Sequence, residues 1–130
     1  MPAETQTLAT SVQYWLTQFE KALAEPSDAP LKALFHPDSY WRDVLALTWR
    51  ICTLGGRDAL AAQLKEHADR TRPFAFQIDP RRSGPREVMR AGADALEAFI
   101  QFETAVGRCS GVVRLTPGDG SAPKAWTLHT

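Results

Sequence analysis

The chain has 130 residues, of which 44% are hydrophobic and 23% are charged, values that favour one folded domain over a disordered chain. Fifteen basic residues balance fifteen acidic ones, so the basic excess of a nucleic-acid-binding protein is missing. No stretch approaches the roughly 20 apolar residues of a membrane span, and the N-terminus lacks a secretory pattern.

The residues 5–25 carry the clearest helical pattern. Apolar side chains recur along one helix face, at Leu8, Val12, Trp15, Leu16, Phe19 and Leu23. Pro26 ends this helix, because the residue before a proline disfavours helical backbone. We expect Ser27 or Asp28 to cap a second, short helix that ends at His36-Pro37.

The segment 39–54 permits more than one assignment. Residues 39–43 are rich in aromatic side chains and predict a strand, whereas 44–48 either continue that strand or form a helical turn. Residues 49–54 predict another strand, which Gly55-Gly56 ends. A third helix is expected over about 57–70, with Asp58 in its first turn and His67 toward solvent.

The remaining residues predict β-structure. Phe74, Phe76 and Ile78 alternate with less apolar residues, 87–91 predict a short strand, and 112–115 and 124–130 predict two more. Between them lies a long alternating run in which one face comprises Leu96, Ala98, Ile100, Phe102 and Thr104. Gly107 predicts a bend and 118–120 a hairpin loop. Helices first and an antiparallel sheet last predict an α+β domain that spans 1–130.

Several local phrases in this order resemble the NTF2-like superfamily, which includes ketosteroid isomerase and SnoaL-type cyclases. They are Trp15-Leu16 with Phe19, the run from Leu34 to Asp43, Gly56-Arg57-Asp58-Ala59-Leu60, and Lys124-Ala125-Trp126-Thr127-Leu128. The set looks most similar to the NTF2-like region that precedes the flavin domain in some flavin-dependent monooxygenases. The resemblance covers nearly the whole chain.

The resemblance implies a cone, in which N-terminal helices pack in the concavity of a curved, mainly antiparallel sheet and an apolar pocket lies at the open end. Gly107 and Gly111 are candidate bend positions. The sequence has no dinucleotide-binding fingerprint, because Gly118 and Gly120 fall in a predicted hairpin. We therefore expect no cofactor.

Asp43 is the best candidate for a catalytic group. The resemblance implies that an aspartate at the end of the first strand acts as a general base, and Asp43 matches that position. If the strand continued, Asp43 would share a side with Leu45 and Leu47, and an apolar surrounding raises a carboxyl pKa toward the range useful for proton transfer. Alternatively, Asp43 pairs with an arginine or caps backbone amides.

Tyr40 and His36 are weaker candidates, as a hydroxyl donor and as an acid or base. Neither the histidines nor the two cysteines, Cys52 and Cys109, have metal-ligand or disulfide spacing, so we expect no metal site and a reduced, cytoplasmic protein. The aromatic residues either form the core or line a pocket for a small apolar or aromatic molecule; those predicted to bind it are Trp15, Phe19, Tyr40, Trp41, Trp49, Phe76, Phe102 and Trp126.

Three functions remain open from the sequence. The first is a small-molecule-binding domain, with a possible accessory role beside an oxidoreductase. The second is a cofactor-independent isomerase, cyclase or dehydratase that uses Asp43. The third is an interaction module that forms a homodimer through the outer sheet face, to which Phe99 and Val112 would contribute. No nucleic-acid or membrane partner is expected.

Overall fold

The elements follow one another as two helices, two strands, a helix and five strands. The computed structural model describes residues 2–25, 27–90, 93–116 and 123–130. Within them the elements are α1 (Pro2–Ala24), α2 (Asp28–Ala33), β1 (Phe35–Val44), β2 (Ile51–Gly55), α3 (Arg57–Thr71), β3 (Phe74–Ile78), β4 (Arg86–Arg90), β5 (Ala93–Thr104), β6 (Gly107–Thr116) and β7 (Lys124–His129). None of the described helices has the length and hydrophobicity to cross a membrane.

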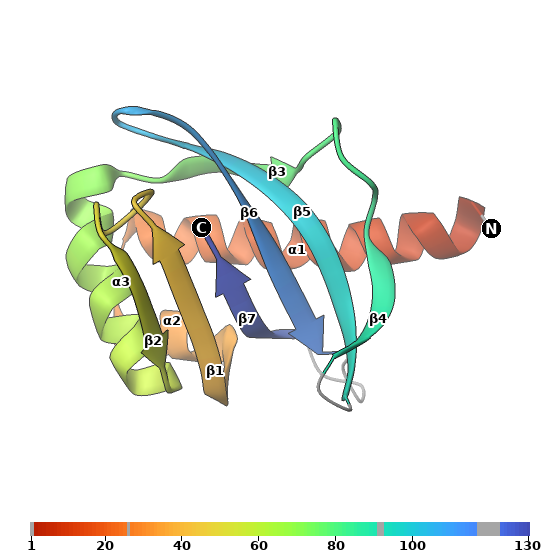
Figure 1. Ribbon diagram of the computed structural model, residues 1–130, viewed down its shortest axis with the longest axis horizontal. Helices are drawn as coiled ribbons and strands as arrows, with labels where there is room; N and C mark the ends of the chain where they lie inside the picture. Colours follow the sequence, from red (N-terminus) through yellow and green to blue (C-terminus); the bar gives the residue numbers. More distant parts are fainter. Residues whose placement is uncertain (1, 26, 91–92, 117–122) are drawn as a thin grey trace.

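The strands form one mixed sheet in the order β2-β1-β7-β6-β5-β3, and β4 pairs with the first half of β5. All neighbouring pairs are antiparallel except β1 and β7, which run parallel. The long hairpin of β5 and β6 crosses the middle of the molecule (Figure 1). Its strands are joined by a tight turn at Ala105 and Val106, which returns the chain along the same sheet.

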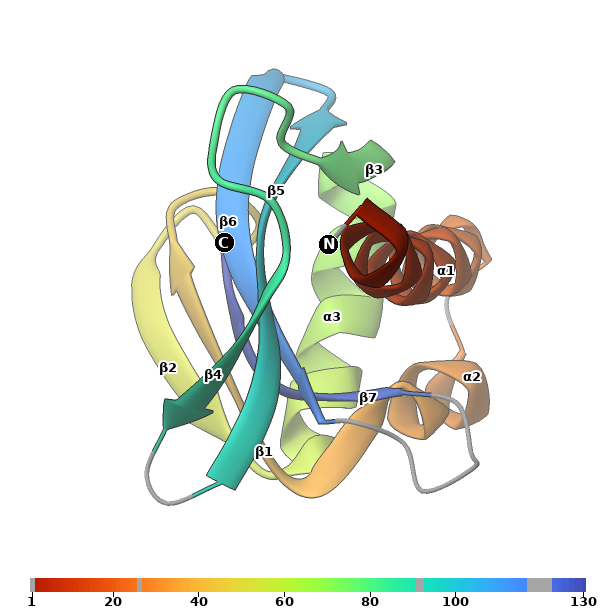
Figure 2. The same ribbon diagram turned by 90° about the vertical axis from the view of Figure 1, so that its right-hand side faces the viewer.

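The helices cover one face of the sheet, and the other face is free of helices (Figure 2). Register shifts interrupt β1, β3 and the pairing of β6 with β7, and such bulges increase the twist and bend of a sheet. At Gly111 a methyl group would lie 2.2 Å from the carbonyl oxygen of His129. Only glycine therefore fits at this close approach of β6 to β7.

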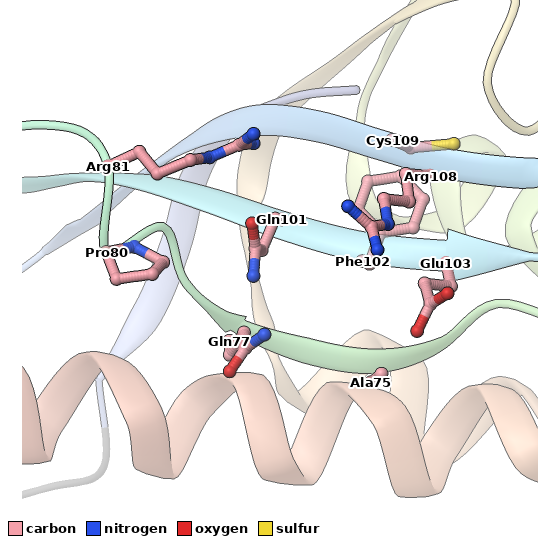
Figure 3. A pocket seen from close by; sticks show the side chains of 9 residues that line it. All are labelled: Ala75, Gln77, Pro80, Arg81, Gln101, Phe102, Glu103, Arg108 and Cys109. Atoms are coloured by element: carbon pink, nitrogen blue, oxygen red, sulfur yellow. The ribbon is translucent and has the colours of Figure 1, made fainter.

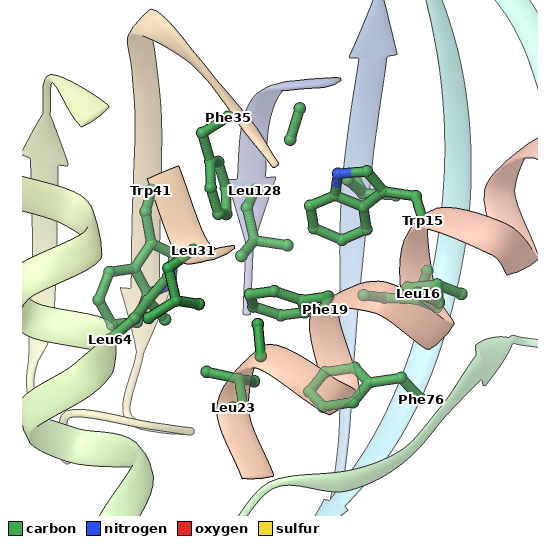
Figure 4. Packing of buried hydrophobic residues seen from close by; sticks show 14 of the residues in the cluster. Trp15, Leu16, Phe19, Leu23, Leu31, Phe35, Trp41, Leu64, Phe76 and Leu128 are labelled. Carbon is green, nitrogen blue, oxygen red and sulfur yellow. The ribbon is translucent and has the colours of Figure 1, made fainter. Parts of the chain in front are cut away.

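Aromatic side chains fill the space between α1 and the sheet (Figure 4). Trp15 stacks on Phe19 at 4.8 Å between ring centroids, Phe19 meets Phe76 edge-on at 5.2 Å, and Phe76 stacks on Phe102 at 4.7 Å. Phe35 packs against both Trp15 and Phe19. Offset-stacked and edge-on pairs add about 0.5–1.5 kcal/mol each to the burial of apolar area, so these contacts tie the first helix to three strands.

The predicted α+β architecture is confirmed, and the boundaries differ in informative ways. The first strand begins at Phe35 and ends at Val44, so the short helix does not reach His36-Pro37. Residues 45–50 form a turn and not a continuation of the strand. Phe74 is 48% exposed, because the register shift after it turns it away from the buried Phe76. The hairpin loop predicted at 118–120 lies outside the described residues.

The outer face of the sheet is largely polar. The carboxylate of Glu97 is buried beneath two arginines, accepting hydrogen bonds from Arg114 at 2.8 Å and from Arg86 at 3.1 Å. The guanidinium of Arg82 lies 4.1 Å from the ring centroid of Phe99. The loop after β3 therefore folds back onto this face and covers the apolar residue nearest the centre of β5.

Candidate functional site

The carboxylate of Asp43 lies at the inner side of β1 and is completely buried. The backbone N–H of Thr48 donates to it at 2.7 Å, the Thr48 hydroxyl at 2.6 Å, and the backbone N–H of Leu47 at 3.1 Å. A fourth donor is the hydroxyl of Thr130, at 2.6 Å. An ionised carboxylate inside a protein needs such a set of donors to replace water.

These hydrogen bonds hold a turn that is otherwise unfavourable. Leu45 and Trp49 both have left-handed backbone angles, φ 73° and φ 61°, which are rare for bulky residues and cost about 1–3 kcal/mol each. Asp43 fixes the segment between them through the amides of Leu47 and Thr48. The turn is therefore stabilised from inside by a single side chain.

The same carboxylate also holds residue Thr130 in place. The indole N–H of Trp41 donates to the Thr130 hydroxyl at 2.9 Å, and that hydroxyl donates to Asp43. The backbone of Thr130 bonds to Val44 and Arg42 at 2.8 and 3.0 Å. Asp43 therefore links the turn between β1 and β2 to Thr130, the residue that follows β7.

Beside this cluster, at the end of the sheet where the β1–β2 and β5–β6 turns lie (Figure 1), the surface forms a hollow of about 500 Å³. We call it the tip hollow. Its walls are Val44, Leu45, Ala46, Trp49, Thr104, Val106, Gly107, Arg108, Cys109, Ser110 and Thr130. Leu45, Trp49 and Val106 are exposed by 56%, 50% and 76%, so apolar surface faces solvent here.

Trp49 is held in place from the side of α3. The guanidinium of Arg70 lies 4.3 Å from the Trp49 ring centroid and donates to Nδ1 of His67 at 2.7 Å. The His67 Nε2 faces Gln63 at 3.2 Å. Burial and the neighbouring Arg70 lower the pKa of His67, which favours the neutral ring that accepts this bond. His67 is 7% exposed, contrary to the expected solvent position.

The aromatic residues predicted to bind a ligand divide into two groups. Trp15, Phe19, Phe76 and Phe102 are buried and pack on one another, and Trp41 is buried in the same hydrophobic core. Tyr40 and Trp49 are half exposed, and Trp126 is partly buried next to the register shift in β6 and β7. Of the eight, Trp49 is the one that lines the tip hollow.

Tyr40 and His36 lie apart from Asp43. Tyr40 is on the outer side of β1, where its ring covers Gly55 of β2. His36 contacts the hydroxyl of Thr116 at the opposite end of β1. The structure therefore does not bring the three predicted catalytic side chains together, and the assignment of Asp43 as a base remains a prediction.

Comparison with solved structures gives matches over almost the whole chain. An NTF2-like superfamily protein from Salmonella enterica serovar Typhimurium aligns with a TM-score of 0.60 and 13% identity, covering 96% of this chain and 90% of that one. An NTF2-like protein of unknown function from Pseudomonas putida aligns at 0.60 and 8% identity, covering 95% and 85%. A Mycobacterium tuberculosis protein of unknown function aligns at 0.62 and 15% identity, covering 99% and 74%.

The chain has the NTF2-like fold. The identities are too low to carry a function with the fold. No family model matches the chain, and no curated protein matches it. The function must therefore be argued from the residues of this NTF2-like domain.

A second hollow of the NTF2-like domain, about 290 Å³ in volume, lies between β3, β5 and β6 (Figure 3). We call it the polar hollow; it is lined by Ala75, Gln77, Pro80, Arg81, Gln101, Phe102, Glu103, Arg108 and Cys109. Burial raises the pKa of the Cys109 thiol, so this cysteine is a poor nucleophile.

A third hollow, of about 470 Å³, follows α1 and α2 and includes Trp15 and Tyr14.

Sequence reasoning singled out Trp49 but missed the other residues that define the tip hollow. The sequence places Leu45 on the apolar side of a continued strand, because a positive φ without glycine has no sequence signature. Thr48 follows Asp43 closely, and a local carboxylate-to-amide pattern of this kind is typical of turns. Thr130 is 87 positions from Asp43 and gave no signal at all. Among the described residues no cluster of histidine, cysteine and acidic side chains could hold a metal ion.

We predict that Asp43→Asn destabilises the protein by about 3 kcal/mol, because an amide N–H₂ would face donors where a carboxylate now accepts. Denaturant unfolding followed by tryptophan fluorescence measures the loss. Asp58→Asn is the matched control, since Asp58 is 85% exposed in an ion pair with Lys32 and such pairs contribute little. Equal unfolding midpoints for both variants would contradict the structural role of Asp43.

Proposed function

We propose that this NTF2-like domain binds a small apolar or aromatic molecule in the tip hollow and does not itself catalyse a reaction. The observation that carries the proposal is the exposure of Leu45, Trp49 and Val106 around one hollow of about 500 Å³. Its size lies within the range of small-molecule sites. A turn held in an unfavourable conformation displays two of these side chains to solvent, and such strain is found most often at functional sites.

The tip hollow has few polar groups. Ser110 contributes a hydroxyl and Arg108 a cation, whereas the buried hydroxyl of Thr130 is already bonded to Trp41 and Asp43. An apolar wall with a few polar groups is the usual composition of a ligand site, in which burial supplies affinity and hydrogen bonds orient the ligand. The ring of Trp49, fixed by Arg70, offers a flat surface on which an aromatic ligand can stack.

The alternative is an isomerase, cyclase or dehydratase in which Asp43 removes a proton. In that reaction the carboxylate would have to exchange a donor, such as the Thr130 hydroxyl, for the substrate. Asp43 does not line the tip hollow, although its neighbours Val44 and Thr130 do. The contacts therefore favour binding over proton transfer by this residue.

An accessory role beside an oxidoreductase extends the proposal. Its support is the resemblance to the region ahead of the flavin domain in some monooxygenases. A binding domain of this kind would deliver or retain an apolar substrate for a separate enzyme.

The ligand site is tested by titrating an aromatic probe, naphthol, and following the indole and methyl NMR signals of Trp49 and Val106. We expect saturable shifts at both residues. Val106→Ser should weaken binding about fivefold, the equivalent of about 1 kcal/mol of lost apolar burial.

Met89→Ser is the matched control, because Met89 is 66% exposed but does not line the tip hollow. It should leave the affinity unchanged. If naphthol shifts no signal at the tip, or if both variants weaken binding equally, the tip hollow is not a ligand site.

A second candidate function, homodimerisation through the outer sheet face, rests on a different observation. Val44 and Ile51 are register partners on that face and are 50% and 62% exposed, next to the half-exposed Tyr40. These residues make a better candidate contact than Phe99, which lies beneath Arg82.

Light scattering after gel filtration tests this second candidate. We expect a dimer for the unaltered protein and a monomer for Ile51→Lys, which places a charge within the apolar contact. A monomer at micromolar concentration for the unaltered protein would contradict it.

A further inference from the structure

The polar hollow differs from the tip hollow in its chemistry. Five of its side chains are polar or charged: Gln77, Arg81, Gln101, Glu103 and Arg108. Except for Arg81, these side chains have no hydrogen-bond or ion-pair partner within the part of the chain that the structure describes. Figure 3 shows them around a common space, with the guanidinium of Arg81 reaching across β5 and that of Arg108 directed toward the middle.

Strand pairing explains why these groups meet. Gln77 of β3 is the register partner of Gln101 of β5, and Glu103 of β5 is the register partner of Arg108 of β6. Directly opposed residues in a sheet present their side chains on the same face. The two amides therefore lie at one end of the hollow and the two opposite charges at the other.

Arg81 is anchored at its base. Its backbone N–H donates to the carboxylate of Asp79 at 2.9 Å, and this hydrogen bond lowers the pKa of the buried Asp79. The Nε of Arg81 lies 3.4 Å from the same oxygen. The terminal nitrogens of the guanidinium remain directed over the hollow.

The unpaired charges define the ligand that fits. Glu103 and Arg108 lie opposite each other on the adjacent strands β5 and β6. They form no ion pair within the described residues, so each charge is available to a ligand. With Arg81 and Asp79 compensating one another, the hollow is close to neutral and carries one free cation and one free anion. A guanidinium matches a carboxylate in geometry, and a carboxylate accepts from an ammonium group.

We propose that the polar hollow binds an α-amino acid or a similar zwitterion with a polar side chain. Arg108 receives the carboxylate, Glu103 receives the ammonium group, and the amides of Gln77 and Gln101 face the side chain. The polar hollow shares Arg108 and Cys109 with the tip hollow, whereas Gln77, Gln101 and Glu103 line the polar hollow alone.

L-Glutamine is the probe, compared with N-acetyl-L-glutamine, which lacks the ammonium group, and with L-glutaminamide, which lacks the carboxylate. Calorimetry and the side-chain amide NMR signals of Gln77 and Gln101 report binding. We expect L-glutamine to bind at least tenfold more tightly than either derivative, because each derivative loses a hydrogen bond between charged groups.

Variants assign the two charges separately. Arg108→Gln should weaken the binding of L-glutamine tenfold or more and leave the binding of L-glutaminamide nearly unchanged. Glu103→Gln should weaken the binding of L-glutamine by a similar factor and leave the binding of N-acetyl-L-glutamine nearly unchanged. Arg42→Gln is the control, because Arg42 lies on the outer face with Thr53 as its partner and outside the polar hollow. All three variants should keep the thermal midpoint of the unaltered protein.

Equal affinity for the three probes would show that the ammonium and carboxylate groups of the ligand are not recognised, and it would overturn the proposal. So would the absence of saturable binding up to the solubility limit, or an equal loss in Arg42→Gln. None of these outcomes bears on naphthol binding at the tip hollow, whose readouts are Trp49 and Val106.

Discussion

A single buried carboxylate determines how one end of this molecule is built. A charge inside a protein is tolerated only when donors replace its hydration, and Asp43 obtains them from Leu47, Thr48 and Thr130. In return the turn that follows β1 is fixed in a conformation that its bulky residues disfavour. Val44, Leu45, Ala46 and Trp49, at and beside this turn, form one wall of the tip hollow, so that wall depends on the acid behind it.

This arrangement gives Asp43 a structural role, the binding of backbone amides, which the sequence leaves open as an alternative to catalysis. An aspartate at the end of the first strand suits both a general base and an anchor for backbone amides. The two roles differ in which groups contact the carboxylate oxygens of Asp43. One of these groups is the hydroxyl of Thr130, which is far from Asp43 in the sequence. Asp43 lies one residue before the end of β1, and its carboxylate points inward to the donors that surround it.

The regular parts of the fold were predictable because their patterns are local. The stripe from Leu8 to Leu23 and the alternation from Leu96 to Thr104 are both buried on the expected side where the structure describes them. The turn at 45–50 was predicted only as an alternative to a continued strand, because no glycine, proline or asparagine marks it. The predicted solvent position of His67 was wrong. His67 is buried on α3 and accepts a hydrogen bond from Arg70, and hydrophobic periodicity cannot predict such a polar contact.

The aromatic residues illustrate the limit for the candidate site. Composition alone cannot separate an aromatic core from an aromatic pocket, since both contain the same residue types. Packing separates them: Trp15, Phe19 and Phe76 contact one another closely, while Trp49 is set apart by the turn that Asp43 holds. The surface hollows were beyond prediction, because they arise from register and backbone angles.

Native-state hydrogen exchange of the Leu47 and Thr48 amides tests the central claim most directly. If Asp43 holds the turn, both amides exchange only through global unfolding, with the same denaturant dependence as the core amides of β1 and β7. Fast exchange that denaturant does not change would mean that the turn opens by itself, and it would contradict the account.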